Sequence, residues 1–377
     1  MPFVAGDATP PRRLPWFVRP DARTWTCAPP PAEVRDFHAG QPGYAPTALA
    51  DLPALAREFG VGRVFVKDES SRLGLPAFKA LGASWAVHRV LTERADGGAD
   101  GQLRLVTATD GNHGRAVARM ARLFGQRSHV FVPRGVHPAA VTAIEDEGAR
   151  ITLVPGSYDE AVRRAADAAA RGRDSVLVQD TAWPGYERIP GWIVEGYSTL
   201  FAEIDTQLGA AGAGTPDLVA VPTGVGSLAQ AAVAHYRSRP AGRVPTALLS
   251  VEPDTAACVL ASLGRRGPVS VPTGATTMAG LNCGTISSLA WPFLRDGLDA
   301  AVAVTDADSA RAARDLAAVG VAAGPCGAAS LAGARATLTG EGAAERRTAL
   351  ALGPTSTVVL LSTEGTAANP HAQEARS

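Results

Sequence analysis

The sequence predicts an α/β fold built on parallel sheets, and three observations support this class. The chain of 377 residues is long enough to bury a large core and to form about two domains. Short β-branched or aliphatic segments recur along it, and alanine-rich amphipathic stretches of helical length separate most of them. Strands that alternate with helices favour a parallel sheet with right-handed crossovers. Ligands bind such sheets beyond the carboxyl ends of the strands, so we expect functional residues in the loops there.

The predicted strands follow one another along most of the chain. They are residues 64–66, 103–107, 130–132, 151–154, 175–178, 218–221, 247–251, 301–304 and 357–361. The proline- and arginine-rich residues 1–45 are expected to form an irregular N-terminal arm. Residues 340–354 are predicted to be a linker of low hydrophobicity, and residues 371–377 a tail.

Helix start and stop signals lie between these strands. Pro138 is placed to open a helix that Gly148 can close. Ser157 and Glu160 resemble a capping box at the start of the next helix.

Lys79 is one of only two lysines in the chain, and it lies in a helix predicted to begin at Pro76. Ala83, Ala86 and Val90 share its face at helical spacing, so its amine has apolar neighbours. Loss of hydration would lower the pKa of the amine toward the neutral form that Schiff-base chemistry requires. The alternative is a lysine whose charged end reaches water. The loops described next favour the first interpretation.

Composition bears on the class of partner. Lysine and arginine total 36, as do aspartate and glutamate, so no net charge favours nucleic acid or a membrane surface. No apolar segment approaches the ~18 residues of a membrane span, and no secretory signal is recognisable, so we expect a cytoplasmic protein. The four cysteines show no metal-ligand spacing, and no metal site is predicted. Whether Cys258 and Cys283 pair in space is left open by the sequence.

The segment Pro222–Ala229 follows one predicted strand and precedes a helix. Its glycines allow backbone N–H groups to point inward, and the helix N-terminus adds positive dipole character, so the segment suits a phosphate. A tight turn without a ligand is the plainer alternative. The segment also fits the dinucleotide pattern G-x-G-x-x-A, and Glu252 follows the next strand where a ribose-binding acid would lie. An NAD-dependent dehydrogenase is therefore a competing interpretation.

A second loop, Thr109–Gly114, lies between a predicted strand and a predicted helix. Its short polar side chains and the helix N-terminus suit a carboxylate. Asn112 could donate a hydrogen bond to a phenolic oxygen without carrying charge. His113 could serve the ligand, or it could simply cap or pack.

Two more loops follow predicted strands. Asp180 comes after residues 175–178, where an ordinary turn aspartate is the alternative. Ser362 and Thr363 come after the last strand, where a hydroxyl can bond a pyridine nitrogen without fully protonating it. A plain turn is the alternative there.

The order of these motifs resembles the tryptophan-synthase-like (fold type II) pyridoxal-phosphate enzymes, and within that group the diaminopropionate ammonia-lyase family. The likeness runs from about Gly43 to Pro370. The matching segments are Lys67–Ser70, Ala77–Lys79, Ala108–Arg115, Gln179–Trp183, Met278–Leu281 and Ser362–Gly365. The resemblance implies a two-lobed architecture in which each lobe is a mostly parallel sheet flanked by helices. The large cofactor-binding domain would comprise residues 46–103 and 184–370, and the small domain residues 104–183.

The resemblance also implies a role for each motif, with pyridoxal 5'-phosphate as the cofactor. The catalytic residues would be Lys79, which forms the Schiff base, and the carboxylates Asp110 and Asp180. The cofactor phosphate would be held by Gly224, Val225, Gly226, Ser227 and Leu228. Asn112 would bond the phenolic oxygen, and Ser362 or Thr363 the ring nitrogen. The substrate would contact Thr109, Asp110, Gly111 and His113.

Asp110 carries the prediction of the substrate. Related hydroxy-amino-acid dehydratases usually have serine at this position, whereas a carboxylate suits a second ammonium group. An amine leaves only when protonated, so an acid–base group must lie nearby, and Asp180 would raise the pKa of Asp110 by like charge. With Lys79 on one face and Asp110 on the other, either stereoisomer of 2,3-diaminopropionate could lose its α-proton. The chain is thus predicted to release pyruvate and ammonia from this small amino acid, as a homodimer without nucleic-acid or membrane partners.

One segment departs from the family pattern. Where the family pattern has Gly-Glu-Ser-Gly, Gly324–Gly327 is Gly-Pro-Cys-Gly. The missing glutamate and serine bear on the substrate, and a serine/threonine dehydratase-type ammonia-lyase is the alternative. An amino-acid sensor without turnover is a third interpretation, beside the dehydrogenase.

Overall fold

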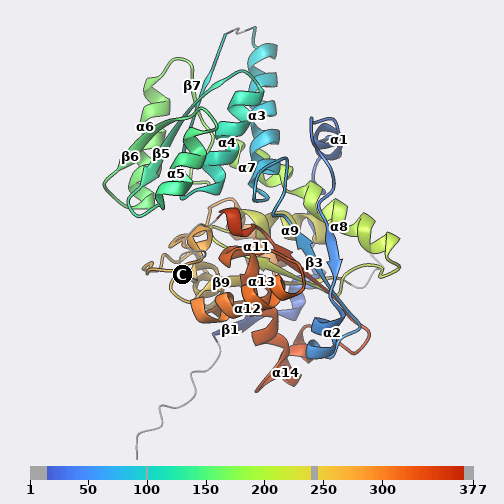
Figure 1. Ribbon diagram of the computed structural model, residues 1–377. Coiled ribbons are helices and arrows are strands. Elements are labelled where there is room, and N and C mark those ends of the chain that lie inside the picture. The colour runs from blue at the N-terminus through green and yellow to red at the C-terminus, as the bar shows by residue number, and fades with distance from the viewer. Residues whose placement is uncertain (1–14, 99–100, 239–244, 369–377) are drawn as a thin grey trace, which may run out of the picture.

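The computed structural model describes residues 15–98, 101–238 and 245–368. Its strands form two sheets that lie apart in space (Figure 1). The larger sheet contains β1 (Trp16–Val18), β2 (Leu49–Asp51), β3 (Arg63–Asp68), β8 (Leu218–Pro222), β9 (Ala247–Pro253), β10 (Ala300–Val304) and β11 (Thr357–Ser362). The smaller sheet contains β4 (Arg104–Ala108), β5 (Arg127–Pro133), β6 (Arg150–Val154) and β7 (Ser175–Leu177).

Both sheets are mostly parallel. The larger has the strand order β1-β10-β9-β8-β11-β3-β2, and only its edge strands β1 and β2 pair antiparallel with their neighbours. The smaller has the order β6-β5-β4-β7, and all its pairs are parallel. The predicted fold class is therefore confirmed.

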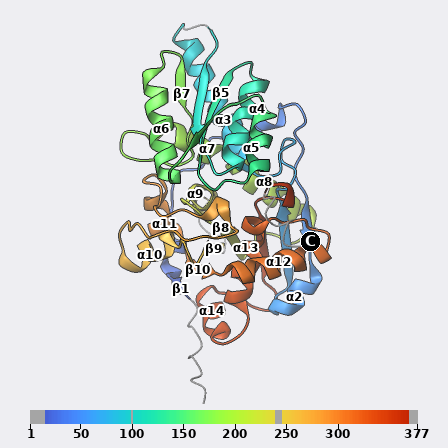
Figure 2. The ribbon, with the colours of Figure 1, turned by 60° about the vertical axis from the view of Figure 1, so that its left-hand side comes forward.

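Helices cover both sheets (Figures 1 and 2). The α-helices are α1 (Glu33–Ala39), α2 (Pro53–Phe59), α3 (Lys79–Asp96), α4 (Asn112–Leu123), α5 (Pro138–Glu145), α6 (Tyr158–Arg171), α7 (Arg188–Gly196), α8 (Ser198–Ala210), α9 (Ser227–Arg237), α10 (Cys258–Arg265), α11 (Ala290–Gly297), α12 (Asp306–Ala318), α13 (Pro325–Leu338) and α14 (Ala343–Ala349). Three short 3₁₀ helices are η1 (Pro20–Thr24), η2 (Ala279–Leu281) and η3 (Thr366–Ala368). Among the described residues no helix is long and apolar enough to cross a membrane.

The core of the larger sheet shows the two-residue period of a buried strand. Val64 and Val66 of β3 pack in one cluster with residues of α2, α12 and α13. Phe65, between them, packs in a second cluster with residues of α3, α7, α8 and α9. Because both faces are covered, these strands are apolar on both sides, which is the pattern expected of parallel sheets.

Helices also cover both faces of the smaller sheet. Val106 and Ala108 of β4 pack with the alanines of α6. Val130 and Val132 of β5 pack with Ala118 of α4 and with α5. The carboxyl ends of these parallel strands, with their loops, lie at the edge that turns toward the larger sheet (Figures 1 and 2).

Two expectations of irregular structure are wrong. Residues 15–45 contribute β1 to the larger sheet and also form η1 and α1, because Trp16–Val18 pairs with the free edge of β10. The expected linker at residues 340–354 contains α14, which begins after Gly342. The remainder of the predicted arm (residues 1–14) and the predicted tail (371–377) lie outside the described residues.

The start of α3 also differs from its prediction. The helix begins at Lys79, three residues after Pro76. The backbone N–H of Phe78 donates to the carbonyl of Thr363, and that of Gly365 donates to the carbonyl of Pro76. The segment before Lys79 is thus bound to the end of β11 instead of continuing the helix.

The other predicted helix ends are close to the observed ones. α5 begins at Pro138 and ends at Glu145, three residues before Gly148. Ser157 caps α6, because its hydroxyl accepts the N–H of Glu160.

Candidate active site

Loops from both sheets surround a cavity of about 780 Å³. The predicted site residues come together on its wall: Lys79, Thr109, Asp110, Gly111, Asn112, His113, Asp180, Gly224, Val225, Gly226, Ser227, Leu228 and Thr363. Ser362 lies behind this wall, fully buried. The loops come from the carboxyl ends of parallel strands, where such folds bind ligands.

Lys79 pairs with Asp180 in this cavity. Its Nζ lies 2.6 Å from Oδ2 of Asp180. Burial alone would lower the pKa of Lys79, but the charge and hydrogen bond of Asp180 outweigh burial and raise it above its ordinary value. The lowered pKa expected from the sequence is therefore wrong in direction, since that expectation included the apolar helix face but not the carboxylate from the loop after β7.

Asp180 connects three parts of the site. Burial would raise its pKa, but His113 and the Lys79 ammonium hold the pKa of Asp180 well below its usual range. Nδ1 of His113 lies 3.8 Å from Oδ2 of Asp180. The Ser227 hydroxyl donates to the backbone carbonyl of Asp180 at 2.8 Å, which ties the glycine loop to the same turn. Asp180 is thus an ionised carboxylate at the centre of the site.

The pKa of Asp110 is shifted in the opposite direction. Burial and the negative charge of Asp180 raise its pKa from 3.8 to about 7, although Lys79 opposes the rise. The predicted direction of this shift is confirmed, with burial as the larger cause. A carboxyl group with a pKa near neutrality can both give and take a proton at physiological pH.

The loop that carries Asp110 is fixed by its own hydrogen bonds. The Thr109 hydroxyl accepts the N–H groups of Gly111 and Gly114, each at 2.9 Å. Gly111 precedes α4 with φ +151°, a conformation that L side chains rarely adopt. His113 Nε2 lies 2.8 Å from the carbonyl of Val178, so this nitrogen carries a proton. The N-terminus of α4 is thereby held against the cavity.

The glycine loop forms a cradle, and its packing leaves no room for side chains at its glycines. Gly226 precedes α9 with φ +102°, and a Cβ added there would lie 2.9 Å from Cδ1 of Leu294. A Cβ added at Gly224 would lie 3.0 Å from Sγ of Cys283. The first N–H groups of α9 have no acceptor within their helix, and they lie at this loop. Together they suit a phosphate group.

The end of β11 supplies uncharged hydroxyls. Thr363 lines the cavity, and the Ser362 hydroxyl is buried without a hydrogen-bond partner among the described residues. A buried polar atom of this kind calls for a ligand or an ordered group. A lysine amine, a glycine cradle at a helix N-terminus, an amide and a buried hydroxyl thus form a donor set that fits pyridoxal phosphate.

The cavity residues without a role assigned from the sequence include Tyr158, Cys283, Cys326 and Glu364. The Tyr158 hydroxyl accepts from Nε2 of Gln179 at 2.8 Å, and burial raises its pKa well above the usual value. Tyr158 comes directly after the N-cap Ser157, shortly after the predicted strand 151–154, and this position indicates a residue near the cavity. Glu364 stands inside the Ser362–Gly365 motif, but a turn glutamate gives no sign of pointing inward.

The structure excludes the ribose-binding role that the sequence suggested for Glu252. This side chain is fully buried, and its two carboxylate oxygens accept the N–H groups of Val259 and Leu260, each at 2.7 Å. It therefore caps α10 from within the core and is not available to a nucleotide. Cys258 and Cys283, whose pairing the sequence left open, are both free thiols.

The fold and the site together define an enzyme that uses pyridoxal phosphate. The chain belongs to the pyridoxal-phosphate-dependent enzyme family, whose family model matches residues 40–363.

More particular relatives are diaminopropionate ammonia-lyases. The chain is 36% identical to that of Salmonella typhimurium over 301 residues, which cover 75% of this chain and 74% of the relative. It is 38% identical to that of Escherichia coli K12 over 276 residues, which cover 70% and 68%. A crystal structure of the Escherichia coli enzyme, in complex with an aminoacrylate–PLP azomethine reaction intermediate, superposes with a TM-score of 0.85 at 33% identity and covers 96% of both chains.

Proposed function

We propose that this protein is a pyridoxal-phosphate-dependent ammonia-lyase that removes the β-amino group of 2,3-diaminopropionate and yields pyruvate and ammonia. The observation that carries the proposal is a pair of carboxyl groups with opposite pKa shifts beside one lysine amine. The pKa of Asp180 is lowered, and the pKa of Asp110 is raised to about 7. Carboxylates whose environments separate their pKa values typically divide acid and base work between them. The relatives named above act on the same substrate class.

The cofactor would be held by residues of both sheets. Lys79 would bind its carbonyl carbon, and the glycine loop with Ser227 its phosphate. Asn112 would donate to its phenolic oxygen, and Ser362 or Thr363 would bond its ring nitrogen. Pyridoxal phosphate supplies an electron sink for the negative charge that develops at the substrate α-carbon.

Asp180 would orient the amine of Lys79. The Nζ of Lys79 must be neutral before it can attack a carbonyl or remove a proton. Oδ2 of Asp180, at 2.6 Å, holds Nζ in place and favours its ammonium form, so the proton of Nζ must pass to a stronger base than Asp180. His113 lies on the other side of Asp180, with its Nδ1 3.8 Å from Oδ2.

Asp110 would act on the leaving group and on one stereoisomer. As a carboxylate it attracts the β-ammonium of the substrate, and the proton that the departing amine needs stays on that nitrogen when the Cβ–N bond breaks. Lys79 would take the α-proton from one stereoisomer and Asp110 from the other. A neutral hydroxyl leaving group, as in serine, would gain nothing from an anionic neighbour.

A substrate comparison tests the proposal. Release of pyruvate from D- and L-2,3-diaminopropionate, pyruvate from L-serine and ketobutyrate from L-threonine would be measured with the purified protein and pyridoxal phosphate. We expect kcat/KM to be highest for diaminopropionate, and we expect Lys79→Ala to abolish turnover. A higher kcat/KM for serine or threonine would support a dehydratase instead.

We further propose that the enzyme is a cytoplasmic homodimer of amino-acid catabolism, with residues 46–103 and 184–370 as its large domain and residues 104–183 as its small domain. The four free thiols fit a reducing compartment, and the proteins that the sequence resembles are usually dimers. Light scattering of the purified protein tests the oligomer, since a monomer mass would contradict it.

A further inference from the structure

Glu364 lies where two walls of the cavity meet. Its side chain is only 4% exposed. Oε2 accepts a hydrogen bond from Nδ2 of Asn112 at 2.6 Å, and Oε1 accepts the backbone N–H of Cys326 at 3.1 Å. Asn112 begins α4 beside the smaller sheet, whereas Glu364 and Cys326 belong to the larger sheet and its helices. One carboxylate therefore joins both halves of the site.

The backbone of Glu364 is held as firmly as its side chain. It forms a bridge with Ala77, two residues before Lys79. Its carbonyl accepts the N–H of Gly324 at 2.9 Å, directly before α13. The position of Glu364 is thus coupled to the turn that presents Lys79 and to the start of a buried helix.

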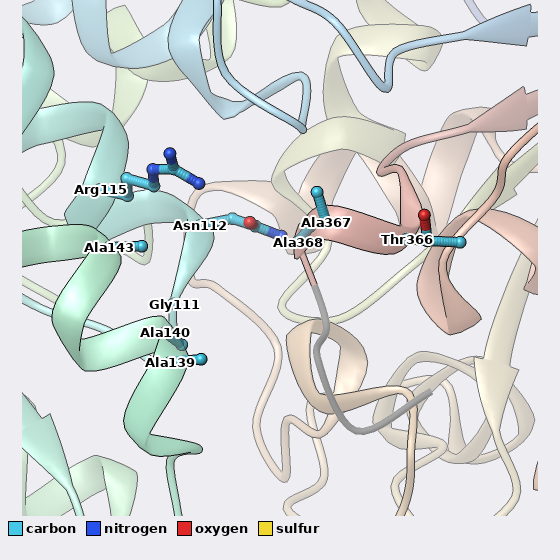
Figure 3. A pocket seen from close by; sticks show the side chains of 9 residues that line it. All are labelled: Gly111, Asn112, Arg115, Ala139, Ala140, Ala143, Thr366, Ala367 and Ala368. Atoms are coloured by element: carbon cyan, nitrogen blue, oxygen red, sulfur yellow. The ribbon is translucent and has the colours of Figure 1, made fainter. Parts of the chain in front are cut away.

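The contact with Asn112 fixes the direction of an amide. Both carboxyl oxygens of Glu364 accept hydrogen bonds here, so the side chain selects the NH₂ end of the asparagine side chain. Rotation of the amide by half a turn would place two oxygens against each other. One N–H is held by Glu364, and the second remains as a donor beside the cavity that Asn112 lines. Figure 3 shows the Asn112 side chain extending from α4 toward η3.

The two glycines that bound the segment Gly324–Gly327 make room for this carboxyl group. A Cβ added at Gly324 would lie 3.0 Å from Oε1 of Glu364, and one added at Gly327 would lie 2.8 Å from the Glu364 carbonyl. The carboxylate uses the backbone N–H of Cys326, which any residue other than proline provides. Its Oε1 thereby accepts one of the N–H groups in the first turn of α13 that have no acceptor within the helix.

We propose that Glu364 is a positioning residue that holds the Asn112 amide with an N–H directed at the phenolic oxygen of pyridoxal phosphate. The inference rests on the proposed function, because it concerns the same cofactor. Glu364 acts through Asn112 and does not itself touch the reacting atoms.

The test is the affinity of cofactor-free protein for pyridoxal phosphate, measured by absorbance titration without substrate. We expect Glu364→Ala and Asn112→Ala each to weaken binding about tenfold, which is the size of one lost charge-assisted hydrogen bond. Because both residues act at one contact, the double variant should bind no more than about twofold more weakly than Asn112→Ala alone. Glu364→Gln keeps one acceptor oxygen that can still face Asn112, and it should recover part of the affinity.

Asp299→Asn is the matched control. Asp299 is also a fully buried carboxylate, paired with Arg23 and Arg237, but it lies outside the cavity. The Asp299→Asn substitution should lower the unfolding midpoint and leave cofactor affinity unchanged.

Failure of the wild-type protein to bind the cofactor would contradict the proposed function itself. Normal binding by the wild type together with unchanged binding by Glu364→Ala, or additive losses in the double variant, would overturn the role of Glu364. If Glu364→Ala does not fold, Glu364→Gln decides, because equal losses in Glu364→Gln and Asn112→Ala would exclude a role through the acceptor oxygen.

Discussion

The Nζ of Lys79 and Oδ2 of Asp180 lie 2.6 Å apart, although 101 positions separate the two residues in the chain. Lys79 begins α3, which comes after strand β3 of the larger sheet, and Asp180 comes after β7, the last strand of the smaller sheet. The pair therefore forms only when the two sheets are in place. It also sets the protonation state of the amine on which the proposed chemistry depends.

Replacing Asp180 should reverse the pKa shift of Lys79. In Asp180→Asn the charge that raises the pKa is gone, while the burial that lowers it remains. In cofactor-free protein, the labelling of Lys79 by an amine-reactive reagent would be measured by mass spectrometry as a function of pH. The midpoint of this labelling curve should shift to lower pH in the variant. Wild-type cofactor-free protein labelled in parallel is the control, and the other lysine, Lys67, is fully buried and should react in neither protein. An unchanged or higher midpoint for Lys79 would contradict the pairing.

Asp110→Asn should discriminate between stereoisomers. Both activities should fall because the β-ammonium loses its anionic neighbour, and the isomer whose α-proton Asp110 takes should lose about 100-fold more, the usual contribution of a general base. Steady-state release of pyruvate from each pure isomer provides the measurement. Equal losses for both isomers, or none, would refute the assignment of the two faces.

The same variant should change how stability depends on pH. The folded protein holds the Asp110 proton up to about pH 7, whereas the ordinary pKa is 3.8. Between these values the unfolded state has lost a proton that the folded state still binds, so this group's contribution to stability falls as pH rises, and its cost is complete above pH 7. Cofactor-free Asp110→Asn should therefore gain thermal stability relative to wild type at pH 8 and lose that advantage near pH 4. A difference in Tm that does not change with pH would contradict the raised pKa.

A buried ion cluster joins β3 and the loop after it to α8. The Glu203 carboxylate accepts from Nζ of Lys67 and from Nη1 of Arg72, each at 2.6 Å, and both cations are fully buried. Glu203→Ala leaves two buried cations short of a partner and should lower the free energy of unfolding by about 3–5 kcal/mol. Denaturant unfolding measures this loss. Arg163→Ala, which removes an exposed ion pair with Glu160, should leave the midpoint almost unchanged; comparable losses in both variants would argue against the cluster.

Much of the fold and site was predictable because it depends on local pattern. Aliphatic segments such as residues 218–221 can hardly form anything but buried strands, and the loops after them must gather at one edge. The ion pair of Lys79 was not predictable, because apolar spacing on a helix carries no information about a carboxylate 101 positions away. The late start of α3 at Lys79 has the same origin, since the bonds that hold Pro76 and Phe78 come from residues 363 and 365.

Glu364 illustrates the limit most clearly. It stands in the Ser362–Gly365 motif, but the sequence predicts a role only for the hydroxyl groups of that motif. Its contacts with Asn112 and Cys326 arise from tertiary packing of three separate elements. Likewise, Glu252 had the spacing of a ribose-binding acid, yet the short distance to the start of α10 made it a helix cap instead.

The central claim is that Lys79 carries pyridoxal phosphate and that the site eliminates ammonia from diaminopropionate. Absorption spectra of wild-type and Lys79→Ala protein, each reconstituted with pyridoxal phosphate and then mixed with 2,3-diaminopropionate, test it most directly. We predict a protein-bound cofactor band in the wild type that changes on addition of the substrate while pyruvate accumulates, and neither the same band nor pyruvate from Lys79→Ala. A wild type without the band, an identical band in Lys79→Ala, or a spectrum indifferent to diaminopropionate would contradict the account.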